Sequence, residues 1–258
     1  MKRVYVPTVV MALVVLVLGS SAGGMDMKGK ASVEVDIGYD AFTFAGIGDW
    51  YNAWAAELEF LGWTVVENRP PNQAIPYGIK FKYGLSPRLG VTASAGTFSS
   101  TGKLASSLSG ADLTIDTTVS STVFGAGVQI VLIDPPEFNI FAEVEARYWM
   151  VAYDESWWET GATTAAKREA GGSKIGGAIA IGGEYFLRNT SISLVGKIGY
   201  RVGKLDQIAT RRDDFGSSEI GEPLQTIDPV TFHYKDMQID LGGWGVSFGV
   251  CFPIFAKR

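Results

Sequence analysis

The chain has 258 residues with a formal net charge of −5, one cysteine and one histidine. Its acidic balance and scattered basic residues argue against nucleic acid as a partner, and a single cysteine excludes an internal disulfide framework. The length suits one domain.

The N-terminus predicts a secretory signal peptide. Lys2 and Arg3 precede an uncharged apolar run over residues 9–18, and small residues follow up to a cleavage point after Ala22. This arrangement predicts export and removal of residues 1–22. A membrane-anchoring helix is the alternative, but no stop-transfer charge cluster closes the run. After a short segment, 23–30, no second apolar run in residues 31–258 is long enough to cross a bilayer as a helix.

Eight segments of the exported chain alternate between apolar residues and polar or small ones, with the period of two that is typical of strands. They cover residues 33–41, 79–83, 89–96, 113–132, 140–150, 174–187, 192–202 and 237–255. The last segment is the clearest, because its large apolar residues alternate with Gly245, Ser247, Gly249 and Cys251. Large apolar groups on one face and small or polar groups on the other favour a strand with hydrocarbon outside and a crowded lumen inside.

The predicted connections alternate in length. Residues 84–88, 134–137 and 188–190 form tight turns, whereas 46–76, 99–111, 155–172 and 206–233 are expected to be long loops. Short turns at one end and long loops at the other are typical of outer-membrane barrels. The expected fold is all-β, an eight-stranded antiparallel up-and-down transmembrane β-barrel over residues 31–258, with short periplasmic turns, long extracellular loops and a short helix in the first loop.

A soluble barrel with an apolar interior shows the same alternation. The unequal loops, the Gly-rich long strands and the aromatic C-terminal end favour the membrane barrel. The charged residues, among them Asp40 and Lys174, then face the lumen, where acids and bases can pair across a narrow interior. The predicted lumen ion-pair network consists of Glu34, Asp36, Lys80, Lys82, Glu143, Glu145, Arg147, Glu184, Lys197, Arg201 and Asp240.

The first loop carries the predicted helix. Asp49 is expected to cap a helix that continues to about Leu61. Its apolar stripe consists of Trp50, Trp54, Leu58 and Leu61. The stripe either lies on lipid or closes the barrel mouth, or it packs on the rim and the other loops. We favour packing.

Catalytic and metal sites have little support in the sequence. His233 is the sole histidine, and it could act as a general base with Asp236 and either Ser217 or Ser218. No nucleophile motif surrounds either serine. The acids of the last long loop lack a calcium-loop pattern, and the glycines follow strand periodicity rather than a phosphate-loop pattern. We therefore expect no catalytic residues, no metal and no cofactor.

The chain resembles the small outer-membrane β-barrel proteins that include the OmpA transmembrane domain, OmpX and OmpW. The resemblance rests on the eight segments, the turn pattern and the closing I-D-L-G-G-W-G-V-S-F-G-V-C-F-P-I-F. It implies the bacterial outer membrane, contact with outer-membrane lipid and lipopolysaccharide, and recognition of the last strand by the barrel-assembly machinery. The implied signal residues are Trp244, Phe248, Phe252 and Phe255. Either Phe252 or Phe255 takes the signal position, since three further residues follow.

Three functions remain open at this point. The first is a non-enzymatic surface barrel with a lumen closed by ion pairs and loops for structural roles or for an unidentified extracellular partner. The second is a narrow channel or conduit for small or hydrophobic molecules, as resemblance to OmpW implies. The third is a lipid-modifying enzyme that depends on His233.

Overall fold

The computed structural model describes residues 28–42, 44–187, 190–216, 219–227 and 234–255. The predicted signal peptide lies outside these residues. The described elements are β1 (Ala31–Phe42), α2 (Ala45–Phe60), β2 (Thr64–Arg69), β3 (Gln73–Ala74), β4 (Tyr77–Gly84), β5 (Leu89–Leu108), β6 (Ala111–Ile133), β7 (Phe138–Glu159), β8 (Ala166–Phe186), β9 (Ser193–Val202), β10 (Lys204–Leu205), β11 (Ala209–Asp213), β12 (Gln225–Ile227), β13 (Tyr234–Asp236), β14 (Ile239–Asp240) and β15 (Gly243–Phe255).

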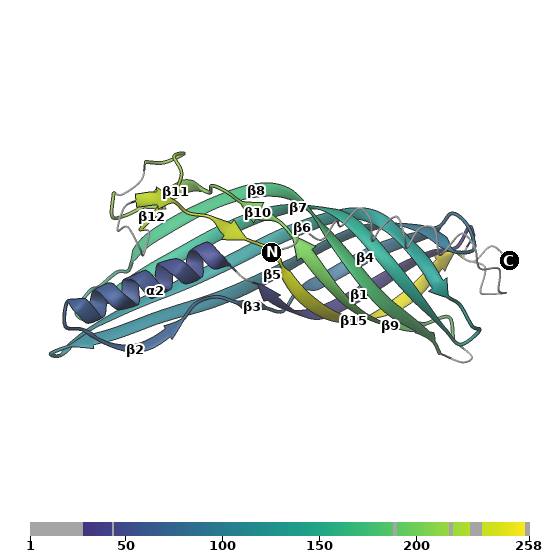
Figure 1. The fold of residues 1–258 in the computed structure, drawn as a ribbon, viewed down its shortest axis with the longest axis horizontal. Coiled ribbons are helices and arrows are strands. Elements are labelled where there is room, and N and C mark those ends of the chain that lie inside the picture. Colours follow the sequence, from purple (N-terminus) through teal and green to yellow (C-terminus); the bar gives the residue numbers. More distant parts are fainter. Residues whose placement is uncertain (1–27, 43, 188–189, 217–218, 228–233, 256–258) are drawn as a thin grey trace, which may run out of the picture.

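Eight of the described strands close into a barrel (Figure 1). Their order around the ring is β8-β7-β6-β5-β4-β1-β15-β9, and β9 pairs back onto β8. Each neighbouring pair is antiparallel. The short connections β4–β5 and β6–β7 lie at one end of the ring. Two residues of the predicted turn 188–190, at positions 188 and 189, lie outside the described residues. The predicted eight-stranded antiparallel barrel is confirmed.

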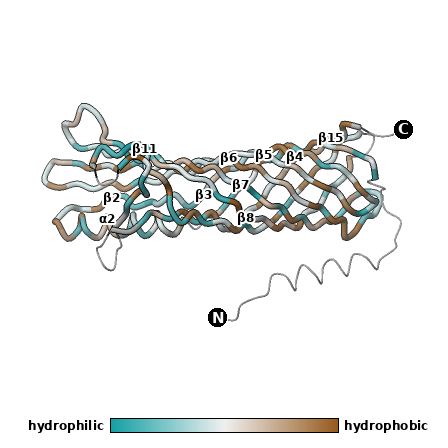
Figure 2. Tube along the Cα trace, turned by 90° about the horizontal axis from the view of Figure 1, so that it is seen from above, coloured by the Kyte–Doolittle hydropathy of each residue, from teal (hydrophilic) through white to brown (hydrophobic). Residues whose placement is uncertain are grey.

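The outward face of the barrel is an apolar belt. Figure 2 shows hydrophobic residues at intervals along the barrel strands, alternating with more polar ones. The outward side chains include Val35, Ile37, Ile79, Phe124, Val144, Ile179, Ile198, Val246 and Phe248, all of them exposed. Tyr39, Tyr77, Tyr148 and Trp244 lie towards one end of the belt, and Tyr83 and Tyr185 lie towards the turns. Aromatic residues at both margins of an apolar belt are typical of membrane barrels.

Four strands continue far beyond the ring. β5, β6, β7 and β8 have 20, 23, 22 and 21 residues, whereas β4 has 8 and β9 has 10. The predicted loop 99–111 is therefore wrong, because β5 and β6 meet at a tight turn in which Ser109 and Gly110 both have positive φ. The predicted loop 155–172 is also mostly strand. Beyond the barrel the long strands form a sheet in the order β2-β5-β6-β7-β8-β11.

Helix α2 packs on the inner face of this extension (Figure 1). We use the term cap for α2, β2, β11 and residues 97–122 and 149–172 of the long strands. The cap has a buried apolar core that includes Phe44, Ile47, Trp50, Tyr51, Leu58, Phe98, Leu104, Ile115, Trp149 and Tyr153. Met237, Ile239 and Leu241 also join this core, so the last barrel strand begins at Gly243 and not at Met237.

The helix differs from its prediction at both ends. It begins at Ala45, and its N-cap is Phe44 in a left-handed conformation, so Asp49 lies inside the helix and does not cap it. Its N-terminal turn lies very close to a neighbouring segment, since a Cβ added at Gly46 would be 2.3 Å from the carbonyl oxygen of Gln238. Among the described residues, no helix is both long and apolar enough to cross a membrane.

Candidate functional site

The lumen of the barrel contains a charged network near its turn end. Strand register places Glu34 of β1 opposite Lys80 of β4, with both side chains on the inward face. Lys82 Nζ lies 2.6 Å from Glu34 Oε2 and 3.8 Å from Glu184 Oε2, which is on β8 across the ring. Lys197 of β9 donates to Glu34 Oε1 and lies 3.0 Å from Asp36 Oδ2. Glu34 therefore holds two lysines from different strands.

A second group lies further towards the cap. Lys80 donates to Glu143, and its Nζ is 2.8 Å from Oε1 of Glu145, so this group links β4 to β7 across the lumen. Arg147 donates from Nε and Nη2 to Oε2 of Glu145 at 2.9 and 2.7 Å. Glu145 is thus paired with two cations.

Arg201 closes the network next to the barrel mouth. It donates to Asp40 of β1, and its guanidinium carbon lies 4.6 Å from the ring centre of Phe42. The ring of Phe141 similarly lies 5.4 Å from Lys82 Nζ. These aromatic supports, and the hydrogen bond from Ser193 to Glu184, were not predicted. Alternation along a strand predicts the face on which a side chain lies, but not the side chain that it contacts across the lumen.

The paired groups nearly balance in charge and are mostly buried. Six acids face five bases, namely Glu34, Asp36, Asp40, Glu143, Glu145 and Glu184 against Lys80, Lys82, Arg147, Lys197 and Arg201. Glu34 is fully buried, and Arg147 has the most exposed side chain among these bases, at 24%. Buried charges are stable only when they are paired. This part of the lumen is therefore filled by mutually neutralising side chains.

Two polar-face residues lie apart from the network. Asp240, predicted to be in it, belongs to β14, and its carboxylate accepts from the backbone N–H of Gly242 at 2.7 Å. The reason is that the barrel strand starts after Asp240, at Gly243. Lys174 is exposed and lies 3.4 Å from Asp206.

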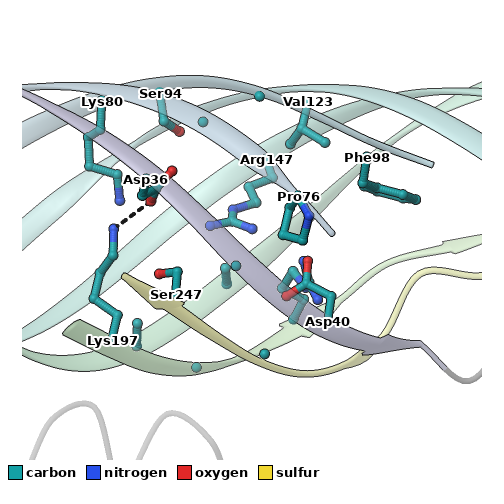
Figure 3. A pocket seen from close by; sticks show the side chains of 18 of the residues that line it. Asp36, Asp40, Pro76, Lys80, Ser94, Phe98, Val123, Arg147, Lys197 and Ser247 are labelled. Carbon is teal, nitrogen blue, oxygen red and sulfur yellow. Dashed lines mark hydrogen bonds and ion pairs between the residues drawn. The ribbon is translucent and has the colours of Figure 1, made fainter. Parts of the chain in front are cut away.

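A small cavity of about 140 Å³ remains inside the barrel. Figure 3 shows Lys80, Arg147 and Lys197 reaching into this space, together with Asp36 and Asp40. Ser94 and Ser247 also line it. The cavity has room for only a few water molecules, and its walls carry both signs of charge.

The cap contains its own buried polar cluster, outside the membrane-spanning segments. Glu155 accepts hydrogen bonds from Tyr153 and from the indole of Trp157. Arg168 lies 3.8 Å from Glu155 and 3.4 Å from Asp213 of β11. Burial is the largest influence on Glu155 and raises the pKa of its carboxyl, although Arg168 and the two hydrogen bonds oppose that shift. The cluster ties β11 to β7 and β8.

Aromatic rings connect this cluster to the helix. Trp157 packs edge-on to Trp54 at 4.9 Å between ring centres, and Phe215 lies 4.9 Å from Trp157 on another side. The sequence predicts a loop at Trp157, but this residue lies on the inward face of β7. Of the predicted helix stripe, Trp50 and Leu58 are buried and Trp54 is partly buried, whereas Leu61 is 59% exposed beyond the helix end. The stripe packs into the cap, and Leu61 is not part of that contact.

The residues of the implied assembly signal lie on β15. Trp244, Phe248 and Phe252 are exposed on its outward face. For Phe255 the structure gives the backbone pairing, which is with Ala31. Cys251 is buried on the inward face.

The residues considered for catalysis are only partly described. His233, Ser217 and Ser218 lie outside the described residues. The carboxylate of Asp236 accepts from the side-chain amides of Gln207 and Gln225, each at 2.6 Å. Within the part of the chain that the structure describes, no group of three His, Cys, Asp or Glu residues is placed to hold a metal ion.

Comparison with known proteins shows the fold. No protein-family model and no curated protein sequence matches the chain. The outer membrane protein OprG from Pseudomonas aeruginosa is similar in structure, with a TM-score of 0.50 and 10% identity over 89% of this chain and 97% of that one. Ail of Yersinia pestis, in complex with the heparin analogue sucrose octasulfate, gives a TM-score of 0.39 and 11% identity over 87% of this chain and 99% of its own. The outer membrane protease OmpT from Escherichia coli gives 0.35 and 7% over 91% and 100%.

The likeness to OprG, together with the apolar belt and the closed ring, shows the fold of a small outer-membrane β-barrel protein. OprG is an outer membrane protein of a bacterium, in agreement with the predicted location. The resemblance inferred from the sequence is confirmed at this level.

Proposed function

We propose that this outer-membrane barrel is non-enzymatic, with a lumen closed by ion pairs and a cap that serves structural or interaction roles. The observation that supports this most is the set of ion pairs that cross the lumen. Lys80 joins β4 to β7, and Lys82 lies between Glu34 of β1 and Glu184 of β8. Opening a passage requires these pairs to separate, and separating a buried pair without replacement costs about 3 to 5 kcal/mol.

The cap adds a second closure above the network. Phe42, Phe98 and Trp149 are buried where the strands leave the ring, and they belong to the same apolar core as α2. An apolar layer is a poor path for ions because it cannot replace their hydration. The occupied carboxylate of Asp236 also gives no support to a catalytic pairing with His233.

A narrow channel or conduit is the second candidate, and the lumen cavity favours it. The cavity of about 140 Å³ is lined by Arg147, whose side chain is 24% exposed, and rearrangement of this arginine would enlarge the space. The two functions differ in one measurable property, the passage of ions through the resting protein.

Conductance of the refolded protein in a planar lipid bilayer tests the proposal, with insertion confirmed by protection of the strands from protease. We expect inserted wild-type protein to be silent. Glu145→Gln, which removes the carboxylate shared by Lys80 and Arg147, is expected to give brief openings. Glu67→Gln is the matched control, because Glu67 forms exposed pairs in the cap. Steady unitary currents from the wild type would overturn the closed-lumen proposal in favour of the channel.

A further inference from the structure

A groove of about 610 Å³ lies on the outside of the barrel wall, beside the first residue of β4, where the neighbouring β5 continues beyond the ring. β5 pairs with β4 as far as Thr97 and with β2 from Lys103 onward. Residues 98–102 of β5 therefore lie between two strand pairings, and the groove follows this interval. One side is formed by Tyr39, Arg69, Gln73, Ile75 and Tyr77, and the other by Thr97, Ser99 and Thr101.

The groove begins at the margin of the apolar belt. Tyr39 and Tyr77 are 45% and 55% exposed at that margin, and tyrosines at such a margin mark the membrane–water interface. Beyond them the outward positions of β5 change to Ser99 and Thr101, which are also exposed. Residues 98–102 extend roughly 15 Å along the strand. The groove therefore rises from the acyl boundary into the layer of lipid headgroups.

Apart from Arg69, which is paired with Glu67, the lining is uncharged and suits a polar ligand with flat apolar faces. The two tyrosines offer ring faces with a hydroxyl at the edge, and Asn72, Gln73 and Ser99 offer amide and hydroxyl groups that both donate and accept. A sugar ring has the matching surface, since hydroxyls surround its edge and C–H groups cover its faces. The volume also falls in the usual range of about 300 to 1,000 Å³ for ligand sites.

The charges at the top of the groove are balanced. Arg69 lies 3.6 Å from Glu67, and Lys103 lies 3.7 Å from the same carboxylate. Asp116 is the cross-strand partner of Lys103 on the outward face. Two cations and two acids give no excess positive charge for a phosphate, so the balance favours the sugar over a phosphate group.

We propose that this groove binds the saccharide headgroup of an outer-leaflet glycolipid. A membrane-anchored sugar fits better than a free one because the lower end of the groove opens beside Ile75 and Tyr77, where acyl chains can lie on the apolar belt. This site goes beyond the proposed function and does not depend on whether the lumen conducts.

Hydrogen exchange of the full protein in phosphatidylcholine nanodiscs tests the site, with short-core lipopolysaccharide added as the probe. We expect the probe to slow exchange in residues 73–77 and 97–101 by about tenfold or more, since bound sugar excludes water from these amides. Ser99→Trp fills the groove and is expected to abolish this protection. Thr101→Trp is a second groove-filling variant, in case the first does not insert.

Ser173→Trp is the matched control. Ser173 is an exposed serine on β8, on the far side of the ring, at the level of Thr97 through the cross-strand partners Thr122 and Met150. This variant should keep the wild-type protection. Equal responses of the Ser99 and Ser173 variants, or no protection in the wild type, would overturn the site. Equal protection by phosphatidylglycerol would reject the sugar, and equal protection by free core oligosaccharide would reject the membrane-anchored source.

Discussion

The barrel and the cap share four strands but use the two faces of those strands in opposite ways. In the barrel part of β7 the inward residues are Glu143, Glu145 and Arg147, and further along the same face they become Trp149, Val151 and Tyr153. The inward face thus changes from charged to apolar within one uninterrupted strand. A charged lumen and an apolar core are therefore two ends of a single surface.

The outward face changes in the opposite sense. On β7, Val144 and Tyr148 face outward in the belt, whereas Asp154 and Ser156 face outward in the cap. On β6 the outward Phe124 is likewise replaced by Thr118 and Asp116. The exterior medium explains the reversal, because the belt must face hydrocarbon and the cap must face water. The strands themselves continue unchanged. In each region the apolar residues lie on the face that has no contact with water.

The two regions should therefore depend on different interactions. The cap resembles a soluble core, in which a helix buries aromatic side chains against a sheet. The lumen depends on pairing of charges from which water is largely excluded. Substitutions matched between the two regions can separate these contributions.

The largest expected effect is on the cap. Trp50→Ala removes a side chain that is 1% exposed and packs against Tyr51, Trp54 and Trp157. Replacing a buried aromatic residue by alanine costs about 3 to 5 kcal/mol. We expect limited proteolysis of the protein in vesicles to cleave the cap while the barrel strands stay protected. Phe60→Ala is the control, because Phe60 is on the same helix but 89% exposed. Simultaneous loss of barrel protection would show that the two regions unfold together.

The next effect is in the lumen. Glu34→Gln removes the carboxylate that holds Lys82 and Lys197, and we expect a loss of about 3 kcal/mol, at the low end for a broken buried pair, because Asp36 still faces Lys197. The urea midpoint of barrel unfolding, followed by gel mobility without heating, measures it. The double variant Glu34→Gln with Lys82→Met is expected to recover part of the loss. A double variant less stable than Glu34→Gln alone would contradict the charge-pairing explanation.

The alternation along the sequence was sufficient to predict the barrel and the inward face. Glu34, Lys80 and Glu145 are predicted to face the lumen because each lies between outward apolar neighbours, and Lys197 because it alternates with the outward Ile198 and Tyr200. The individual ion pairs could not be predicted, because Lys80 contacts Glu145 across the ring and not on a neighbouring strand. Such contacts depend on closure and register, which no local pattern contains.

The cap was missed for a physical reason. Residues 99–108 of β5 alternate as a strand does, but with polar residues such as Thr101 outward and Leu104 inward. At the membrane margin the apolar residues move from the outward positions of the strand to the inward ones, which is a shift of one residue. A pattern search that requires one continuous apolar face therefore ends the strand there. The same reversal hid Trp157 in a predicted loop. The helix can be predicted because its apolar stripe has helical spacing. Its start cannot, because the N-cap residue is Phe44, which provides no side-chain hydrogen bond and so carries none of the usual capping signal.

A smaller effect concerns the pH dependence of the cap. Burial raises the pKa of Glu155 above its ordinary value of 4.5, so folding favours the protonated carboxyl. The contribution of this group to stability is therefore greatest below pH 4.5 and falls as the pH rises through the raised value, by at most about 1.4 kcal/mol per pH unit. Glu155→Gln should flatten this part of the profile. Tryptophan fluorescence in urea between about pH 4 and pH 8 measures it, and an unchanged slope in the variant would assign the dependence to other groups, such as Asp154, whose pKa is also raised by burial.

The smallest effect returns to charge pairing, now on the outside of the cap. Arg69 and Glu67 lie 3.6 Å apart, with side chains 65% and 37% exposed. Water and salt screen such a pair, and Arg69→Ala should change the urea midpoint by less than about 0.5 kcal/mol. Lys80 and Glu145 in the lumen also form a pair of one cation and one carboxylate, 2.8 Å apart, but both side chains are almost fully buried. The comparison with Glu34→Gln isolates exclusion of water as the source of the larger lumen effect. Equal losses in the two variants would mean that the lumen is as well hydrated as the cap surface, and the ion pairs could then separate as readily as exposed ones do.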